Sequence, residues 1–352
     1  MKRIKVSTSK EYDVIVGENL IQDIGIYLPS CLKSNKIAII SDSNVWPLYG
    51  SLLEKQLGSI TCSVCSFVFH AGEASKTTNT YFAILTFLAE NHITRSDCLI
   101  ALGGGVTGDM TGFAAATFLR GVAYIQIPTS LLAMVDSSVG GKTAIDLPAG
   151  KNLVGAFYQP QLVLCDIGVL NTLPKDYFLD GCAEVIKYSI LYDTELFAHL
   201  ETSGVEFDRE YVISRCIALK RDVVSEDEFD TGSRQKLNLG HTIGHAVESY
   251  SNFTISHGRA VSIGIAIITR AAVKMGLCAA KTHARICQVL NQFCLPINTE
   301  YSAAILAQIA QSDKKRSGNV LNLIIPCEIG TCVIHPICIS QFESIIEAGL
   351  NP

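Results

Sequence analysis

The chain has 352 residues, with 28 Lys and Arg against 33 Asp and Glu, so its formal net charge at neutral pH is −5. Hydrophobic residues make up 48% and charged residues 17%. This balance excludes a disordered chain and leaves enough apolar material for two domains. Because the chain is acidic and has no long Lys/Arg run, it lacks the positive surface that duplex nucleic acid requires, and we expect no nucleic-acid partner.

The N-terminal stretch, the most apolar segment and the cysteines all favour a cytoplasmic protein. The N-terminal stretch MKRIKVSTSKEYDVIVG has no apolar run behind its basic residues and does not resemble a signal peptide. The most apolar segment, 260–276, is interrupted by Arg270 and Lys274 and is too short to span a bilayer, so we expect no membrane association. Thirteen scattered cysteines favour reduced, packed thiols. Cys62 and Cys65 have CxxC spacing, but no second pair follows, so core packing is favoured over metal or redox chemistry.

The first half of the chain has the pattern of a parallel sheet. The first twenty residues alternate apolar and polar, which predicts a hairpin or a pair of edge strands. Short apolar runs then alternate with helix-like segments, which indicates a Rossmann-like, doubly wound α/β domain with its ligand at the carboxyl ends of the strands. The runs that contain the expected strands lie at 36–45, 62–76, 97–109, 123–130 and 162–167, with helices at about 78–92 and 111–119.

From about residue 176 the pattern changes to long helical stretches, at 177–193, 209–227 and 240–250. A late segment, 319–337, predicts a hairpin. We therefore expect an α/β fold in two parts. Residues 1–175 form the N-terminal doubly wound domain, and residues 176–352 form a mainly α-helical C-terminal domain.

The segment GGGVTGD (103–109) follows a predicted strand and opens a helix. Backbone N–H groups in this arrangement can approach a pyrophosphate at a helix N-terminus, although a simple tight turn explains such a cluster about as often. Acidic and basic residues at two other strand ends, Asp42 and the pair Glu73 and Lys76, strengthen the first interpretation, because a carboxylate there can accept hydrogen bonds from a ribose. Together these features favour a dinucleotide.

A second cluster of candidate residues lies in the helical half. His241 and His245 are four residues apart in NLGHTIGHAVES, so a helix projects both from one face. His257 follows in SHGRA, and Glu184 precedes in GCAEVIK. Imidazoles with a carboxylate form a zinc-type ligand set, whereas an isolated HxxxH is more often a hydrogen-bonded pair. Both helix histidines remain candidate ligands, and the glycines nearby favour close backbone packing around a site: Gly240, Gly244, Gly258 and Gly264.

A third set is cationic and lies in an otherwise acidic chain. Lys142 and Lys151 stand among glycines, alanines and apolar residues, where a lysine needs an anion as its partner. Any one member can equally be an ordinary surface residue, but the set favours a substrate with more than one negative group. A dinucleotide, a metal and such a substrate imply hydride chemistry at a metal-bound alcohol. The set comprises Arg120, Lys142, Lys151, Lys187, Lys220, Arg234, Lys314 and Lys315.

Five segments of the sequence resemble the 3-dehydroquinate synthase family, in family order from about Asp42 to Lys315. The resemblance implies conversion of 3-deoxy-D-arabino-heptulosonate 7-phosphate to 3-dehydroquinate and phosphate in the shikimate pathway of aromatic amino acid biosynthesis. Its implied steps are transient oxidation by NAD, phosphate elimination, re-reduction, ring opening and intramolecular aldol closure. It also implies bound NAD, a divalent zinc or cobalt ion, and a cytoplasmic homodimer. The segments are GGGVTGDMTGFAAATFLRG, IPTSLLAMVDSSVGGKTAIDLPAGKNLVGAFYQP, GCAEVIKYSIL, LNLGHTIGHAVE and SDKKRSGN.

The resemblance assigns roles by position. It makes Glu184, His241 and His257 the metal ligands and turns His245 toward the substrate. Arg120 matches a residue that reaches in from the partner subunit, and Lys315 is the alternative to Lys314. The positions that match the NAD site are Asp42, Asn44, Glu73, Lys76, Gly104, Gly105, Val106, Asp109, Thr129, Ser130, Lys142, Lys151, Thr172 and Leu173. The positions that match substrate contacts are Asp136, Lys142, Lys151, Asn152, Lys187, Lys220, Arg234, Asn238, His245 and Lys314.

Three positions depart from the family pattern. The family usually has His-Gly-Glu where this chain has His257-Gly258-Arg259, which places a cation near the expected metal and puts the surroundings of the ligands in doubt. Tyr177 stands where a glutamate is common, and Ser130 replaces a frequent threonine conservatively. None of these changes removes an expected ligand.

Three alternatives remain at this stage. A metal- and NAD-dependent polyol dehydrogenase would show net NADH formation on an uncharged alcohol, but the lysine-rich set counts against it. Sister sugar phosphate cyclases that use sedoheptulose or glucose phosphates differ at the positions of Asn238, His245 and Lys314, and the intact set here favours a substrate with a carboxylate. A non-catalytic NAD- or metal-sensing protein would bind NAD without turnover.

Overall fold

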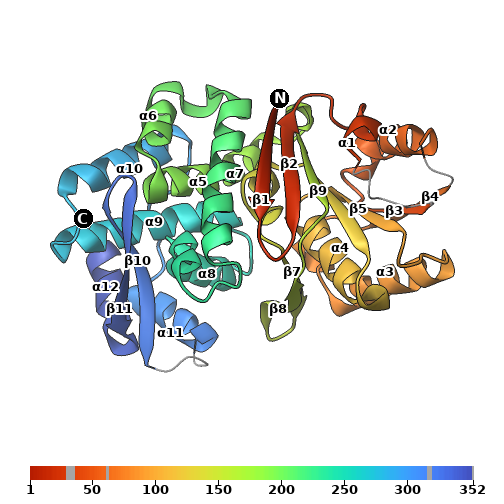
Figure 1. The fold of residues 1–352 in the computed structure, drawn as a ribbon. Coiled ribbons are helices and arrows are strands. Elements are labelled where there is room, and N and C mark those ends of the chain that lie inside the picture. The colour runs from red at the N-terminus through yellow and green to blue at the C-terminus, as the bar shows by residue number, and fades with distance from the viewer. Residues whose placement is uncertain (29–35, 61–62, 315–318, 351–352) are drawn as a thin grey trace. The chain divides into compact units, whose positions relative to one another are not determined.

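The computed structural model describes residues 1–28, 36–60, 63–314 and 319–350, and for residues 311–314 the backbone alone (Figure 1). The chain forms two units, Met1–Pro174 with Arg209–Phe229, and Lys175–Asp208 with Asp230–Pro352. The first change of unit lies next to the expected boundary at 175. Helix α7 (Arg209–Glu226) differs from the expectation, because it belongs to the first unit, where it packs against strand β1. Periodicity shows that a helix has an apolar face but not which surface covers that face.

The first unit contains a seven-stranded sheet in the order β1-β2-β9-β6-β5-β3-β4. Strands β1 and β2 form the predicted antiparallel hairpin, and the strands from β2 to β4 are parallel to one another. The predicted doubly wound sheet is therefore confirmed. The bounds are β1 (Lys2–Ser7), β2 (Glu11–Gly17), β3 (Lys36–Asp42), β4 (Ser63–Phe69), β5 (Cys98–Gly103), β6 (Ala123–Pro128) and β9 (Leu162–Asp166).

Strand β3 creates a switch point in this sheet. It pairs with β4 on one side and with β5 on the other, so the chain leaves in one direction and returns in the opposite one. Ser41 is in register with Leu102, which brings the carboxyl ends of β3 and β5 together. Open α/β sheets bind their ligands at such points, outside the carboxyl ends of the strands.

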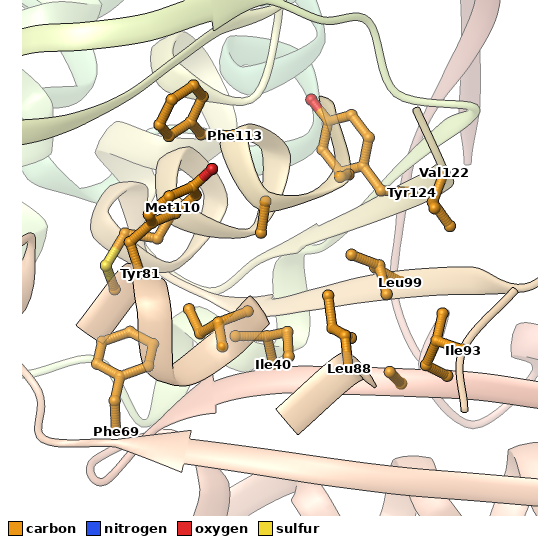
Figure 2. Close-up of a cluster of buried hydrophobic side chains, with 14 of the residues drawn as sticks. Ile40, Phe69, Tyr81, Leu88, Ile93, Leu99, Met110, Phe113, Val122 and Tyr124 are labelled. Carbon is orange, nitrogen blue, oxygen red and sulfur yellow. The ribbon is translucent and has the colours of Figure 1, made fainter. Parts of the chain in front are cut away.

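Helices of the first unit cover the sheet through an apolar cluster (Figure 2). Tyr81 of α3 stacks on Phe113 of α4 with ring centroids 4.7 Å apart, and both belong to a cluster with Ile40 and Leu99 of the sheet. Thr77 caps α3 by accepting a hydrogen bond from the Thr80 N–H. The bounds are α1 (Ile24–Tyr27), α2 (Trp46–Gly58), α3 (Thr78–Glu90) and α4 (Gly105–Thr117).

A second hairpin of the first unit was not predicted from sequence. Strands β7 (Lys142–Leu147) and β8 (Gly150–Phe157) pair antiparallel, and Ile145, Val154 and Ala156 pack against the apolar cluster. The hairpin lies close to α4, because a Cβ on Gly112 would be 2.4 Å from the Thr143 Cγ2 atom. Glycines and small residues in the segment hide the alternation that normally indicates strands.

The second unit is mainly helical, as predicted. Helix α9 is buried along most of its length and packs against α5, α8, α10 and α12. The predicted late hairpin is confirmed as β10 (Val320–Glu328) and β11 (Thr331–Cys338). In the described ranges no helix is both long enough and apolar enough to cross a membrane. The helices are α5 (Lys175–Tyr192), α6 (Thr194–Ser203), α8 (His241–Tyr250), α9 (His257–Lys274), α10 (Ala280–Gln292), α11 (Ala303–Lys314) and α12 (Phe342–Leu350).

The free cysteines that the structure describes are buried or half-buried, as expected, except for the exposed Cys294 and Cys338. Cys98, Cys165 and Cys182 are buried free thiols, and burial raises the pKa of each. Cys65 is a half-buried free thiol of β4, whereas Cys62 lies outside the described residues. Thiols held protonated by burial serve as small hydrophobic side chains.

Helices α8 and α9 approach closely because glycine stands at their contact. A Cβ on Gly264 would lie 2.0 Å from the Gly240 carbonyl oxygen, and Gly240 itself has a φ of +77°, a left-handed conformation that glycine adopts without strain. Neither backbone segment has room to yield. This contact sets the position of the first turn of α8.

We expect Gly264→Ala to destabilise the protein by about 1–3 kcal/mol, because the added methyl group must push α9 away from α8. The midpoint of urea unfolding, followed by circular dichroism, measures this change. Gly58→Ala is the control, since nothing lies within 4 Å of a Cβ added there. Equal midpoints for the two variants would show that the contact yields without cost.

Candidate active site

Three helices of the second unit bring a carboxylate and two imidazoles together. Glu184 lies in the middle of α5, His241 is the first residue of α8, and His257 is the first residue of α9. Glu184 is 0% exposed, and its Oε1 atom lies 3.5 Å from the His241 Nε2 atom and 3.4 Å from the His257 Nε2 atom. One potential ligand atom from each residue lies within 4.8 Å of the others.

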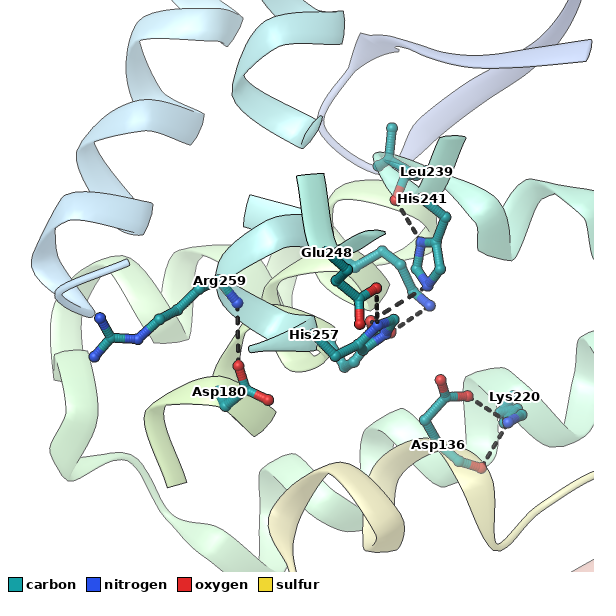
Figure 3. Close-up of polar contacts among 10 residues, drawn as sticks. Asp136, Asp180, Lys220, Leu239, His241, Glu248, His257 and Arg259 are labelled. Atoms are coloured by element: carbon teal, nitrogen blue, oxygen red, sulfur yellow. Dashed lines mark hydrogen bonds and ion pairs between the residues drawn. The ribbon is translucent and has the colours of Figure 1, made fainter. Parts of the chain in front are cut away.

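The other ring nitrogen of each histidine has its own partner (Figure 3). The His241 Nδ1 atom lies 3.0 Å from the Leu239 carbonyl oxygen, and the His257 Nδ1 atom lies 3.0 Å from the Glu248 carboxylate. Because both partners accept hydrogen bonds, each Nδ1 carries the proton. The Nε2 atom of each ring therefore faces Glu184, and it offers a lone pair there when the ring is neutral, as a metal-binding histidine must be.

The electrostatics of the two histidines differ in the absence of a bound cation. Burial, reinforced by the Lys187 ammonium, lowers the pKa of His241 to about 3, so this ring is neutral. Burial also opposes a charge on His257, but the hydrogen bonds and negative charges of Glu184 and Glu248 outweigh it and raise its pKa to about 10. The cluster therefore holds a positive charge in the form of a proton, and a metal ion would replace that proton.

The spacing of the cluster fits a divalent metal ion of the zinc type. Two ligand atoms about 2.1 Å from a tetrahedral ion are about 3.4 Å apart, close to the 3.4 and 3.5 Å found between Glu184 and the two histidines. Two imidazole nitrogens and one carboxylate oxygen leave a fourth position open, as a catalytic site needs.

His245, which the residues alone left as a candidate ligand, lies beside this cluster. Its ring centroid is 5.4 Å from that of His241 and 6.0 Å from that of His257. It forms a second possible ligand group with Glu248 and His257, but it is exposed, and Glu248 already binds the Nδ1 side of His257. The buried group around Glu184 is the better fit.

Lys187 stands one helical turn after Glu184 and forms an ion pair with its carboxylate. Both side chains are almost fully buried. A carboxylate in such a position needs a nearby cation to remain charged. Lys187 therefore helps to keep Glu184 ionised and available as a ligand.

The start of α9, which carries His257, is held by Asp180 of α5. The Asp180 carboxylate accepts hydrogen bonds from the Ser256 hydroxyl at 2.5 Å and from the Arg259 N–H at 3.1 Å. The Arg259 guanidinium extends away from His257 (Figure 3). It pairs with Asp176 at 3.1 Å. The doubt raised by Arg259 is thus removed, because its charge is neutralised outside the cluster.

The remaining predicted residues of the second unit lie in nearby elements or at its surface. Arg234 and Asn238 belong to the short helical segment Ser233–Asn238, where Arg234 is 2% exposed and Asn238 is exposed. Lys314 ends α11 and only its backbone is described, whereas Lys315 lies outside the described residues. Tyr177 is 59% exposed on α5.

In the first unit, the predicted cofactor residues gather at the carboxyl ends of the strands. Helix α4 starts directly after β5, with Gly104 as its N-cap and no side chain bonded over its first N–H groups. This geometry leaves backbone donors and the positive end of the helix dipole for a phosphate. Gly105 and Val106 begin that helix, Thr129 and Ser130 follow β6, and Thr172 and Leu173 follow the short helix after β9.

The strand ends are tied to one another by side chains. The Asp42 carboxylate, at the end of β3, accepts hydrogen bonds from the Asn44 and Val45 N–H groups at 2.9 and 3.1 Å and from the Thr107 hydroxyl at 3.1 Å. The Asp42 carboxylate thus joins the β3–α2 turn to α4. The exposed Asn44 side chain lies in the same turn.

A mixed-charge group follows β4. The Lys76 ammonium lies 2.6 Å from the Asp109 carboxylate, and the Lys151 ammonium lies 3.5 Å from Glu73. Burial raises the pKa of Asp109, although Lys76 opposes this effect. The structure therefore brings together four residues that sequence analysis assigned to the cofactor.

Four further candidates of the first unit remain, namely one ion pair and two exposed side chains. The Lys220 ammonium of α7 pairs with the Asp136 carboxylate and donates to the Asp136 carbonyl oxygen at 2.6 Å (Figure 3). Lys142 is exposed at the start of β7. Arg120 is exposed and has a left-handed φ of 65°. It precedes the amino end of β6, whereas the predicted cofactor residues follow the carboxyl ends of the strands.

Sequence reasoning missed three residues that hold the candidates in place: Glu248, Asp180 and Asp146. Glu248 lies seven positions after His241 on the same helix, a spacing that could have indicated a shared face. Asp180 and Asp146 have no comparable signal. Asp180 binds the Ser256 hydroxyl and the Arg259 N–H of a segment distant in sequence, and Asp146 binds the Asn152 N–H across a turn.

Comparison with known structures defines the class of protein first. A 2-deoxy-scyllo-inosose synthase solved with carbaglucose-6-phosphate, NAD+ and Co2+ is similar with a TM-score of 0.90 and 25% identity, over 99% of this chain and 100% of that chain. A 2-epi-5-epi-valiolone synthase from Streptomyces hygroscopicus, solved with NAD+ and Zn2+, has a TM-score of 0.88 and 26% identity, over 99% and 98%. Glycerol dehydrogenase from Schizosaccharomyces pombe, at 15% identity and a TM-score of 0.67, shares the fold alone. The fold is that of the sugar phosphate cyclases.

Family models and curated relatives then identify the family. The models for the N-terminal and C-terminal parts of 3-dehydroquinate synthase match residues 66–180 and 181–316. The 3-dehydroquinate synthase of Clostridium acetobutylicum is 42% identical over 96% of this chain and 97% of its own length, and that of Enterococcus faecalis is 41% identical over 99% and 100%. The chain belongs to the 3-dehydroquinate synthase family.

Proposed function

We propose that the protein is a 3-dehydroquinate synthase, which converts 3-deoxy-D-arabino-heptulosonate 7-phosphate to 3-dehydroquinate and phosphate in the shikimate pathway. The observation that carries this proposal is the buried Glu184–His241–His257 cluster in a chain that matches 3-dehydroquinate synthases at about 40% identity over nearly its whole length. The reaction is a phosphate-eliminating lyase reaction with no net oxidation.

The cofactors that we propose are NAD and a divalent zinc or cobalt ion. Glu184, His241 and His257 would hold the metal, and the strand ends and the N-terminus of α4 would hold NAD. When bound, the metal would lower the pKa of a substrate hydroxyl, and NAD would accept a hydride and later return it. The sugar phosphate cyclase structures with NAD+ and Co2+ or Zn2+ support both assignments.

The chain's own residues have positioning and electrostatic roles in this proposal. Cations of the predicted set neutralise the phosphate and the carboxylate of the substrate, and they hold the phosphate near the carbon that loses a proton. In the second unit these are Lys187, Arg234 and Lys314, with Asn238 and His245 as polar contacts. In the first unit they are Lys142, Lys151 and Lys220, with Asp136 and Asn152.

We also propose that the working form is a cytoplasmic homodimer in which Arg120 contacts the substrate bound by the partner subunit. Two observations support this role for Arg120. Its side chain is exposed, and it precedes the amino end of β6, whereas the cofactor candidates lie at the carboxyl ends of the strands. Consecutive left-handed residues, Leu119 and Arg120, hold the exposed side chain on a defined turn.

The proposed function predicts phosphate release without net NADH. Purified protein with catalytic NAD, zinc and 3-deoxy-D-arabino-heptulosonate 7-phosphate should release one phosphate per substrate while the absorbance of NADH stays constant. Both signals can be followed in one sample.

Competing substrates separate the alternatives. Faster phosphate release from sedoheptulose 7-phosphate or glucose 6-phosphate would assign the protein to a sister cyclase activity. NADH accumulation on glycerol would instead indicate a dehydrogenase. Normal NAD binding with no turnover of any of these compounds would indicate a sensor.

The metal assignment predicts that His241→Ala loses stoichiometric zinc. Glu248→Ala should weaken zinc binding about ten- to a hundredfold, because His257 loses the partner that orients its ring, whereas Glu248→Gln keeps an acceptor and should lose less. Zinc content after dialysis and competition with a chromophoric chelator measure both effects. His335→Ala, which removes a histidine from the β10–β11 hairpin of the same unit, is the control. Full zinc content in His241→Ala would contradict the ligand assignment.

The proposed role of Arg120 predicts complementation between two inactive variants. In a mixture of refolded or co-expressed Arg120→Ala and His241→Ala chains, each heterodimer has one site with both an intact metal cluster and an intact partner arginine. Activity should then rise to about a quarter of the wild-type value, since half of the dimers form at random as heterodimers and each has one complete site. If Arg120 acts within its own subunit, the mixture stays inactive.

A further inference from the structure

The tip of the β7–β8 hairpin contains an irregularity in its pairing. The register shifts between Ile145 and Leu147, and Asn152 on the opposite strand has a left-handed φ of 56°. Such irregularities leave a residue outside the regular ladder and change the direction of its side chain, often next to functional sites. The residue redirected here is Asn152.

Three residues at this irregularity form a closed ring of hydrogen bonds. The Asp146 N–H donates to the Lys76 carbonyl oxygen at 2.8 Å. The Asp146 carboxylate accepts from the Asn152 N–H at 2.7 Å, and the Asn152 Oδ1 atom accepts from the Lys76 ammonium at 2.5 Å. Each residue is therefore bonded to both of the others, so that none can turn alone.

The ring determines which way the Asn152 carboxamide faces. An ammonium group has donors and no acceptor, so the atom that faces Lys76 must be the amide oxygen. The Nδ2 group then lies in the same plane on the other side of the Cβ–Cγ bond and presents its N–H donors away from Lys76. Asp146 contributes by holding the backbone N–H, which keeps Asn152 in its left-handed conformation.

The ring is mounted on rigid parts of the first unit. Lys76 is 4% exposed and also binds the Asp109 carboxylate of α4 at 2.6 Å. Behind the ring, Ile145 and Val154 pack against the apolar core. A donor group held in this way loses little conformational freedom when a ligand binds.

We propose that Asp146 and Lys76 are positioning residues that fix Asn152 as a hydrogen-bond donor to an oxygen atom of the sugar phosphate. This inference rests on the proposed function and adds Asp146 to the residues that determine substrate recognition. It also gives Lys76, which was assigned to the cofactor side, a second role at the substrate. The alternative is that the ring only stabilises the hairpin turn.

Substitutions at two positions separate these roles. Asp146→Asn keeps an acceptor for the Asn152 N–H, whereas Asp146→Ala removes it. Asn152→Asp keeps an oxygen for Lys76 but replaces the outward N–H donors with a second oxygen. Glu90→Ala, which removes an exposed carboxylate at the end of α3, is the control. Each variant is assayed for KM, kcat, NAD affinity and unfolding midpoint as full-length protein with metal and NAD.

We expect Asp146→Ala to raise KM for the heptulosonate phosphate about tenfold with a change in kcat of less than about threefold, since one oriented hydrogen bond is lost. Asp146→Asn and Glu90→Ala should stay within about twofold of the wild type. Asn152→Asp should raise KM about a hundredfold while NAD affinity is retained, because an oxygen of the substrate then meets a carboxylate. An unchanged KM in Asp146→Ala or Asn152→Asp, or equal effects of Asp146→Ala and Asp146→Asn, would overturn the proposal.

A measurement that needs no turnover tests the ring itself. Hydrogen exchange of the Asn152 backbone amide, followed by NMR or mass spectrometry, should accelerate at least tenfold in Asp146→Ala and remain slow in Asp146→Asn. If the wild type fails to turn over the heptulosonate phosphate, the proposed function fails, and the exchange data still report on the ring. Fast exchange in the wild type would overturn the ring independently of any activity.

Discussion

The structure of the second unit depends on one buried carboxylate. Glu184 is inaccessible to solvent in the middle of a helix, where an isolated negative charge would be strongly unfavourable. Lys187 lies one turn away, and the Nε2 atoms of His241 and His257 lie at 3.5 and 3.4 Å. Lys187 and the protonated His257 compensate the charge, and the Nε2 atoms of both histidines face it. The same arrangement that makes Glu184 tolerable in the core forms a group that could hold a divalent cation.

The surrounding helices are arranged so that this cluster keeps its geometry. His241 and His257 are each the first residue of a helix, so the position of a helix start decides the position of each ring. Gly240 and Gly264 allow α8 and α9 to touch, and Asp180 fixes the first turn of α9 through the Ser256 hydroxyl and a backbone N–H. Close packing and capping thus restrict the movement of the two helix starts and keep the positions of the His241 and His257 rings fixed.

The candidate phosphate site of the first unit consists of backbone N–H groups at the start of α4 rather than of side chains. At the switch point beside β3, helix α4 begins with glycine, and its N-cap makes no side-chain hydrogen bond to the first turn. Side chains then connect the neighbouring strand ends, as Asp42 does for the β3–α2 turn and Lys76 does for the β7–β8 hairpin. The candidate cofactor residues on α4 and the tip of the β7–β8 hairpin are in this way joined through the buried Lys76.

The sequence by itself determined the class of fold and named the members of the candidate metal cluster. Alternating apolar runs predicted the parallel strands and the change to helices near residue 176, because period and length are local properties of the chain. The family motifs assigned Glu184, His241 and His257, whereas the HxxxH spacing alone could not choose between His241 and His245, since both project from one helical face. Only the tertiary structure made that choice on physical grounds, by placing Glu184 beside the Nε2 atom of His241.

Other features were decided by tertiary contacts alone. The sequence placed α7 in the second half, but the helix packs on β1 of the first unit because that surface covers its apolar face. The β7–β8 hairpin escaped prediction because its glycines mask the alternation, and its strands are stabilised by packing on α4. Only folding brings three carboxylates to their partners. Glu248 binds the His257 imidazole, Asp180 binds the first turn of α9, and Asp146 binds the backbone N–H of Asn152, which has a left-handed conformation. Periodicity reports which residues are buried, and folding alone decides which of them meet.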